Sequence, residues 1–223
     1  MDKKELEKYL EDNGLYIIKH SDFETLIDLS GKAFTDYPLH VYIYGGKYDE
    51  EGLKQTMRVN LYSMIDEGII YADSQELNGF VILLPPGYTG IKTFSFIWNG
   101  GFKILYNQGI RALLRMANFE SFAMNLRKKY TNNEDWYIYN LCVHPNQQGK
   151  KISSKLIKPI LNYFKMKKQI CYLETNSDSN VPIYEHFGFK ILEKATFLIV
   201  LLFIIHYYLM ESNLVHSFNN YYL

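Results

Sequence analysis

In the first part of the chain, some stretches repeat apolar residues every three to four positions, as helices do. Others are short apolar runs of the kind that form strands. A polar, helix-forming segment over residues 2–12 ends at Gly14, where glycine supplies a left-handed cap. An apolar stripe at helical spacing begins after Ser21, with Glu24 placed to complete a capping box. A second amphipathic stripe covers residues 49–66. The pattern predicts three helices, the last two with an apolar face to bury.

Short apolar runs around these helices predict strands. Residues 69–73 and 77–84 are joined by a link short enough for a hairpin, and a further strand is expected at residues 15–19. Pro38 disfavours helix at the residue before it, so the first stripe is expected to end there in a turn. From residue 88 to 133 glycines punctuate helical patterns. We interpret that stretch as a helical insertion between two strands of one sheet.

Residues 136–189 have the order strand, glycine-containing loop, helix, strand, loop, helix. Gly149 in the first loop allows a positive φ and a close approach of the backbone to a ligand. Ser153 and Ser154 begin the helix with small side chains, which leave its unpaired N–H groups open to an anion. Lys150 and Lys151 add positive charge at the same place. This loop is either an anion site or a capped helix start on a solvated basic face.

Composition restricts the class of protein without naming it. The chain has 223 residues and a net charge of zero, so nothing indicates a bulk nucleic-acid or membrane-surface binder. Its two cysteines, Cys142 and Cys171, lack metal-ligand spacing and are expected to be reduced and buried, and no metal is expected. The N-terminal segment has no apolar core of a signal peptide, so a cytoplasmic location is expected.

The C-terminal segment differs in composition from the rest. Residues 195–223 contain one Asp, Glu, Lys or Arg, whereas the preceding residues contain 47. The apolar run from Phe197 to Ile205 is shorter than the roughly 20 residues that span a bilayer. Three interpretations are open: a buried strand with a loosely ordered end, a tail anchor, or an end altered by a frameshift. We therefore divide the chain into a domain over 1–194 and an atypical tail over 195–223.

The motifs over residues 136–189 resemble the GNAT superfamily of N-acetyltransferases. Val143-His144-Pro145 supplies the turn after a strand, Gln148-Gly149 opens the loop, and Tyr184 precedes Gly188-Phe189 at the family's spacing. The sequence over residues 173–189, with LET followed by NVPIYEHFGF, looks like the subgroup that includes puromycin N-acetyltransferase. The resemblance is looser over 21–86 and absent after 194. It implies an α/β fold of the α+β type, with a mixed central sheet, two splayed parallel strands, and the helical insertion between the third and fourth strands.

The resemblance also implies acetyl-CoA as cosubstrate, bound between strands 136–143 and 170–175. The pantetheine would pair with the backbone of the first strand, as an extended ligand pairs with a free sheet edge. The implied cosubstrate-binding residues are Leu141, Cys142 and Val143 on that strand, Gln148, Gly149, Lys150, Lys151, Ile152, Ser153 and Ser154 in the loop, and Thr175, Asn180 and Tyr184 beyond it.

The family's chemistry implies three catalytic groups. Tyr184 would donate a proton to the departing thiolate, or else pack as a core tyrosine. The Val143 N–H would stabilise the oxyanion. Glu174 would act as the general base, or else serve as a structural carboxylate, and Glu120 or water are alternatives to it.

Two tyrosines are candidates for the acceptor pocket, and one lysine departs from the family pattern. Tyr37 and Tyr139 line the acceptor pocket or belong to the core. Lys151 stands where the family usually has glycine, which requires a negative φ or a strain of ~1–2 kcal/mol. Ser153 is a smaller departure.

The function expected from this resemblance is transfer of an acetyl group from acetyl-CoA to a primary amine of a small molecule or peptide, through a ternary complex. A different class remains open, a CoA-binding or regulatory module without catalysis. A homodimer is possible, whereas nucleic acid and a membrane are not expected partners.

Overall fold

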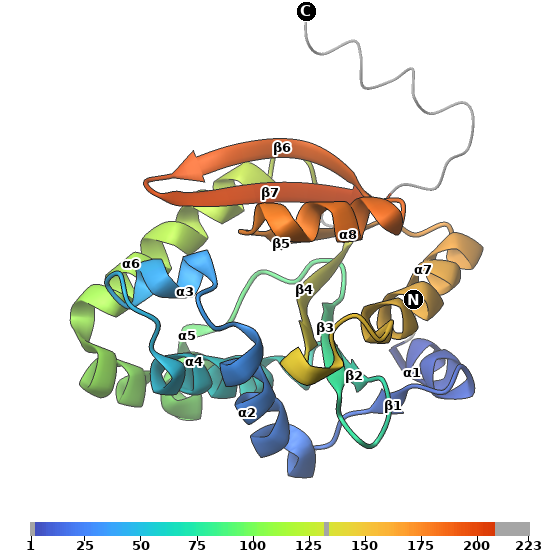
Figure 1. Cartoon of the computed structure of the whole chain (residues 1–223), viewed down its shortest axis with the longest axis horizontal. Helices are drawn as coiled ribbons and strands as arrows, with labels where there is room; N and C mark the ends of the chain where they lie inside the picture. The colour runs from blue at the N-terminus through green and yellow to red at the C-terminus, as the bar shows by residue number, and fades with distance from the viewer. Residues whose placement is uncertain (1–2, 132–133, 208–223) are drawn as a thin grey trace, which may run out of the picture.

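The computed structural model describes residues 3–131 and 134–207, which form a seven-stranded sheet with helices on both faces (Figure 1). Neighbouring strands are antiparallel except β4 and β5, which are parallel, so the sheet is mixed as predicted. In spatial order the strands are β1 (Tyr16–Ile17), β2 (Ile69–Ala72), β3 (Gly79–Leu84), β4 (Trp136–Val143), β5 (Cys171–Thr175), β7 (Val200–Tyr207) and β6 (Lys190–Phe197).

Two pairs of helices cover the two faces of the sheet. On one face lie α1 (Lys3–Asp12) and α7 (Ile152–Lys167), and on the other lie α2 (Phe23–Ala33) and α4 (Glu50–Met64). The side chains of β3 alternate between the two resulting cores, with Val81 in the first and Ile82 in the second. Because both faces are covered, every residue of β3 is buried, as its unbroken apolar sequence predicts.

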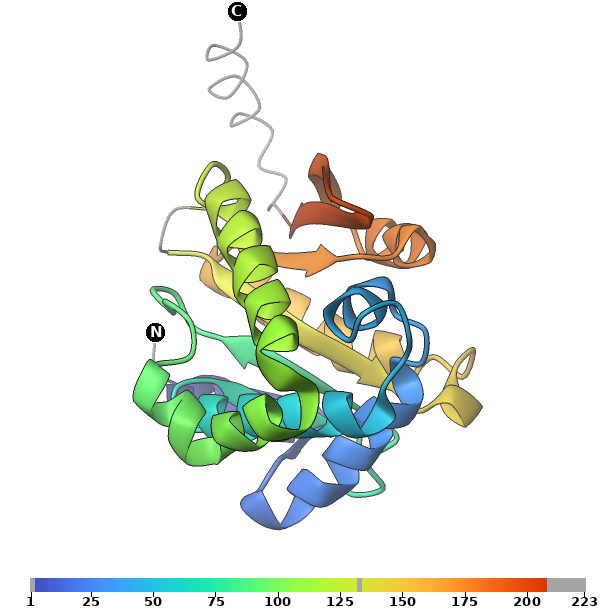
Figure 2. The ribbon, with the colours of Figure 1, turned by 90° about the vertical axis from the view of Figure 1, so that its left-hand side faces the viewer.

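The predicted insertion is helical and consists of α5 (Thr93–Phe96), a π-helical turn η2 (Ile97–Gly101) and the long helix α6 (Phe102–Arg127). Gly109 bends α6, because its φ of 76° and ψ of 167° are not helical. The second half of α6 rises past α4 to reach β7, where Phe119 and Leu126 join a third core with Leu202 (Figure 2). The insertion therefore bridges the two halves of the molecule.

The remaining helical segments are short. They are the 3₁₀ turn η1 (His20–Asp22), the helix α3 (Pro38–Ile43), the 3₁₀ turns η3 (Pro145–Gln147) and η4 (Asp178–Asn180), and the helix α8 (Val181–His186).

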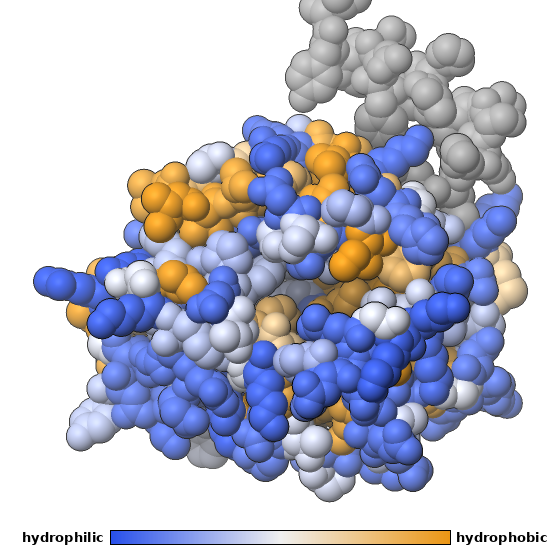
Figure 3. Space-filling view, in the orientation of Figure 1, coloured by the Kyte–Doolittle hydropathy of each residue, from blue (hydrophilic) through white to orange (hydrophobic). Residues whose placement is uncertain are grey.

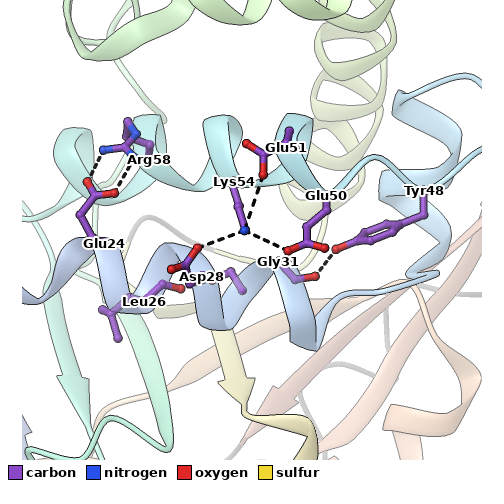
Figure 4. Close-up of polar contacts among 10 residues, drawn as sticks. Glu24, Leu26, Asp28, Gly31, Tyr48, Glu50, Glu51, Lys54 and Arg58 are labelled. Atoms are coloured by element: carbon purple, nitrogen blue, oxygen red, sulfur yellow. Dashed lines mark hydrogen bonds and ion pairs between the residues drawn. The ribbon is translucent and has the colours of Figure 1, made fainter.

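Ion pairs join α2 to α4 on the solvent side of their apolar contact (Figure 4). Lys54 Nζ of α4 lies 3.0 Å from Asp28 Oδ1 of α2, and 2.9 Å from Glu50 Oε1 of its own helix. Two nitrogens of Arg58 contact the two oxygens of Glu24, with Nη2 2.6 Å from Oε2. These contacts are largely exposed, so the buried apolar face holds the helices together and the charges fix their register.

The expected capping box at Ser21 is wrong. The Asp22 carboxylate accepts the backbone N–H of Lys19 at 2.8 Å, which caps η1 rather than α2. Glu24 is instead the partner of Arg58 in α4. A second difference follows Pro38, where the chain turns as predicted but then begins α3, with proline at its first position.

The apolar run after residue 195 completes the sheet. Residues 190–197 form β6 and residues 200–207 form β7, and β7 lies between β5 and β6. The resemblance in sequence ended at residue 194, yet β6 and β7 form an antiparallel pair there, and β6 runs across residue 194. The tail-anchor and frameshift interpretations of residues 195–223 extend over 208–223, which lie outside the described residues, and they stay predictions. Within residues 3–131 and 134–207, no helix combines the length and apolar character needed to cross a membrane.

Candidate active site

Strands β4 and β5 begin side by side and then separate (Figure 2). Their parallel pairing runs only from Trp136–Cys171 to Ile138–Leu173. Beyond that point β4 continues its pairing with β3 as far as Val143, and β5 pairs with β7 as far as Thr175. At the same place Tyr139 is an extra residue, because Ile82 is opposite Asn140 and Leu83 is opposite Ile138. The bulge and the lost pairing open the V-shaped gap predicted from the sequence.

The side of β4 that faces this gap has backbone groups without a strand partner. His144 donates its backbone N–H to the carbonyl of Asn78 at 2.8 Å, on the β3 side. Successive residues of a strand direct these groups to opposite edges, so Cys142 also faces β3. Leu141 and Val143 therefore direct their N–H and C=O groups into the gap. Of the three residues expected to bind pantetheine, the geometry makes these two available and uses the backbone of Cys142 in the sheet.

The loop at the end of β4 has the form of an anion site. Gly149 adopts a φ of +77°, and a Cβ there would meet no atom within 4 Å, so the loop is open. Within the described residues, the first helical hydrogen bond of α7 runs from the Lys155 N–H to the Lys151 carbonyl at 3.0 Å. The N–H groups of Ile152, Ser153 and Ser154 are therefore at the helix N-terminus, available to oxygen ligands. Lys150 and Lys151 are exposed beside them, together with Gln148.

Lys151 adopts the left-handed conformation, with a φ of 65° and a ψ of 17°. The alternative of a negative φ is therefore wrong, and the residue carries the strain that glycine avoids at this position. Lys151 lies directly before α7, so the helix begins here although its preceding residue carries the steric strain of a positive φ.

A cavity of about 160 Å³ lies where the gap meets α3, α4 and α6. In Figure 3 this face of the molecule is hollowed near its centre, at the position of the gap. Tyr37 and Tyr139, expected either in a pocket or in the core, both line the cavity. Its aromatic wall consists of Phe34, Tyr37, Phe119, Tyr137, Tyr139 and Tyr184.

Glu174 lines the cavity and is bound to Arg127 of α6. The guanidinium donates to both carboxylate oxygens, with Nε 2.6 Å from Oε1 and Nη2 3.2 Å from Oε2. Glu120 lies on the other side of the guanidinium, 3.6 Å from Arg127 Nη2. Burial raises the pKa of Glu174, and the charge and hydrogen bonds of Arg127 oppose that rise. The three groups together leave one net negative charge at the cavity.

Tyr184 lies on α8 and is buried at the cavity wall, beside a hydrogen-bonded group at the end of β5. Burial raises the pKa of its hydroxyl, which keeps the proton in place at neutral pH. Thr175 Oγ1 accepts from Asn180 Nδ2 at 3.1 Å and lies 3.2 Å from the Tyr37 hydroxyl. The Asn176 N–H donates to the same tyrosine at 2.8 Å. Thr175 is thus an internal link, whereas Asn180 and Tyr184 reach the cavity.

The sequence did not single out several residues of this site. Arg127 ends the insertion, and its spacing from Glu174 carries no signal because they are brought together by packing of α6 against β7. His40 lines the cavity from α3, a helix that was not predicted. Burial lowers the pKa of His40 to about 4, so its ring is neutral at physiological pH. Among the described residues, no group of three or more His, Cys, Asp or Glu side chains could hold a metal ion.

Comparison with known proteins finds similarity to one family over part of the chain. The sequence profile described as an acetyltransferase (GNAT) domain matches residues 114–191, which contain β4, the anion loop, α7, β5 and α8. A curated relative, an uncharacterized N-acetyltransferase of Schizosaccharomyces pombe, is 28% identical over 172 residues, which cover 74% of this chain and 68% of the relative. The chain is therefore similar to GNAT acetyltransferases over the stretch that contains the candidate site.

Solved structures share the fold at low sequence identity. A Corynebacterium glutamicum protein described as histone acetyltransferase HPA2 and related acetyltransferase aligns with a TM-score of 0.57 at 13% identity, over 87% of this chain and 94% of that one. Arylalkylamine N-acetyltransferase 2 of Aedes aegypti aligns with a TM-score of 0.54 at 16% identity, over 86% of this chain and 96% of that one. At these identities the likeness shows the fold alone. The subgroup resemblance to puromycin N-acetyltransferase stays a prediction.

The strain at Lys151 predicts that Lys151→Gly stabilises the protein. Glycine populates positive φ without steric cost, so the free energy of unfolding should rise by up to about 1 kcal/mol. Urea denaturation measures this as a higher midpoint at an unchanged slope. Lys150→Gly is the matched control, because Lys150 is not at a positive φ and glycine there should lower stability. A gain in the control and none at position 151 would contradict the strain.

Proposed function

We propose that this protein transfers the acetyl group of acetyl-CoA directly to the primary amine of a small molecule, within a ternary complex. The observation that carries the proposal is the free side of β4, which runs from the anion loop at α7 to the cavity beside Tyr184. An extended thioester ligand with a pyrophosphate at one end requires these two features at the two ends of one groove.

The residues present fit acetyl-CoA. Backbone groups of Leu141 and Val143 would pair with the pantetheine, and the N–H groups at the start of α7 would hold the pyrophosphate, with Lys150 and Lys151 adding charge. Asn180 would bind the pantetheine arm from α8. The cosubstrate supplies an acetyl thioester, whose acyl carbon accepts the amine nitrogen.

Tyr184 is proposed as the proton donor at the sulfur atom. A tyrosine hydroxyl is protonated at neutral pH even when exposed, burial raises the pKa of Tyr184 further, and donation to a thiolate is what a departing CoA requires. The Val143 N–H, which faces the gap, is proposed to stabilise the oxygen that gains negative charge.

Glu174 is proposed as the group that takes the proton from the acceptor ammonium. Arg127 binds both of its oxygens and the Tyr137 hydroxyl donates to Oε2 at 3.5 Å, yet Oε1 keeps a second lone pair, and Glu174 lines the cavity. The raised pKa of Glu174 makes it a stronger base than an ordinary carboxylate. His40, also at the cavity, is the competing acceptor.

The cavity supports a small cationic amine as acceptor. Its volume of about 160 Å³ admits a small molecule, and its net negative charge from Glu120 and Glu174 against Arg127 attracts an ammonium group. Aromatic faces on several sides also favour a cation before it loses its proton. A peptide amine would have to enter by its terminus alone.

The proposed function predicts binding followed by turnover. Acetyl-CoA at ~1 mM should raise the unfolding midpoint, since a ligand of the native state stabilises it by mass action. Release of free CoA thiol in the presence of small primary amines should then exceed release in their absence. Stabilisation without amine-dependent thiol release across a broad panel would support the non-catalytic CoA-binding module, for which strained Lys151 is the motivating feature. No stabilisation would count against both.

Replacing Tyr184 by Phe should lower kcat by ~10²-fold or more while leaving acetyl-CoA stabilisation in place, because only the proton donor is lost. Steady-state kinetics and thermal unfolding measure the two effects separately. Tyr62→Phe is the matched control, since Tyr62 packs on Phe23 away from the cavity. Equal rates for wild type and Tyr184→Phe from pH 6 to 9 would remove the proton-donor role.

The proposed role of Glu174 as the base predicts how the rate depends on pH. The base must be deprotonated, so kcat/KM should fall as pH drops through the pKa of Glu174, which burial places above that of an ordinary carboxyl. Glu174→Gln should lose this acidic limb and at least about 10²-fold in kcat/KM, whereas His40→Asn should keep the limb. If His40→Asn loses the limb and Glu174→Gln keeps it, His40 is the proton acceptor. Thermal unfolding of Glu174→Gln checks that Arg127 remains accommodated.

A further inference from the structure

Every fourth residue from 94 to 114 is a large apolar residue, and all six are more than half exposed. Such a period usually marks the face of a helix that packs on the core. Here the inward contacts of the insertion come from other residues, among them Ile104 and Ala112, which are buried. We name the six the apolar ridge: Phe94 (75% exposed), Trp98 (78%), Phe102 (65%), Tyr106 (89%), Ile110 (58%) and Leu114 (54%).

The ridge is attached to a firmly placed support. The π-helical turn η2 packs on α4, where Asn99 Nδ2 donates to Ser63 Oγ at 3.0 Å. The rings of Phe94 and Trp98 stack with centroids 5.8 Å apart. In Figure 2 the supporting segment, α5, η2 and the start of α6, lies at the outer edge of the molecule. Exposed apolar side chains in such number on one segment mark an interaction surface.

The charged residues within the ridge segment itself are all positive. No Asp or Glu occurs between Glu76 and Glu120 in the sequence, whereas four basic residues do. Lys103 and Arg111 are exposed within the ridge segment, and no ion pair with a described residue is found for either. Lys92, just before the ridge, pairs with Glu67 at 2.8 Å. The chain as a whole is neutral, so this segment is a local positive region on a balanced protein.

We propose that the apolar ridge docks on a membrane surface that contains anionic lipids. The ridge is not one straight helix, because Gly100 and Gly109 leave the helical conformation. Its outward Trp, Phe and Leu side chains, with Lys and Arg nearby, nevertheless have the composition of an interfacial membrane anchor. Trp and Tyr favour the headgroup level, and each flanking cation gains from the negative surface potential. Docking against a second copy through a two-fold axis would bring Lys103 and Arg111 near their own copies, and this repulsion disfavours a dimer through the ridge.

The chain carries its own probe for this proposal. It has two tryptophans, and Trp136 is 3% exposed whereas Trp98 is 78% exposed. A change in emission on adding vesicles therefore reports Trp98. With the full chain, we expect a blue shift and co-sedimentation with phosphatidylcholine vesicles containing phosphatidylserine. Binding should weaken with salt and be weaker to phosphatidylcholine alone.

The double variant Phe94→Ser/Trp98→Ser should lower the vesicle-bound fraction at least about tenfold, because two aromatic groups no longer leave water. Leu198→Ser/Ile199→Ser is the matched control, since these residues are 71% and 80% exposed at the β6–β7 turn, and it should bind as the wild type does. Thermal unfolding verifies that both fold. Lys103→Gln/Arg111→Gln should reduce the preference for anionic vesicles.

Three results overturn the proposal. They are no binding of wild type to anionic vesicles, equal loss in the two double variants, and binding that is indifferent to phosphatidylserine. Sedimentation velocity without vesicles tests the competing occupant. A concentration-dependent dimer that is lost in Phe94→Ser/Trp98→Ser would assign the ridge to self-association instead.

Discussion

The separation of β4 from β5 is the constraint on which the site depends. A parallel pair that continued past Ile138 would consume the N–H and C=O groups of β4 and leave no place for an extended ligand. The separation is maintained from both sides, because β4 stays paired with β3 and β5 stays paired with β7. The late strands β6 and β7 are therefore necessary to the site although they contribute little to its lining.

The insertion closes the gap that the sheet opens. Its second half packs on β7 through Phe119 and Leu126, and the same helix turn carries Arg127 to Glu174. A buried carboxylate without this partner would be neutralised or would destabilise the fold. One helix thus joins the two halves of the molecule and sets the charge of the cavity.

Sequence reasoning located the parts of the site that are local in the chain. Residues 136–189 form one strand–helix–strand–helix unit, and the family resemblance implied roles for Gly149 and Tyr184 within it. Contacts between elements that are distant in the chain leave no recognisable spacing in the sequence. The ion pair of Arg127 and Glu174 is an example. The apolar ridge is the opposite case. A four-residue apolar period like that from Phe94 to Leu114 is typical of a buried helix face, yet in the folded protein these side chains are exposed. Zero net charge over the whole chain likewise hid the positive segment around Lys103.

The profile match over residues 114–191 covers the half of the site that would hold the cosubstrate. The other walls of the cavity come from Phe34, Tyr37, α3 and α4, which lie outside that match. These two parts of the site contact each other through side chains, and the backbone that both of them line is the free side of β4. Under the proposed function, acceptor selectivity would therefore vary through residues 34–60, while the profile-matched half keeps the acyl donor.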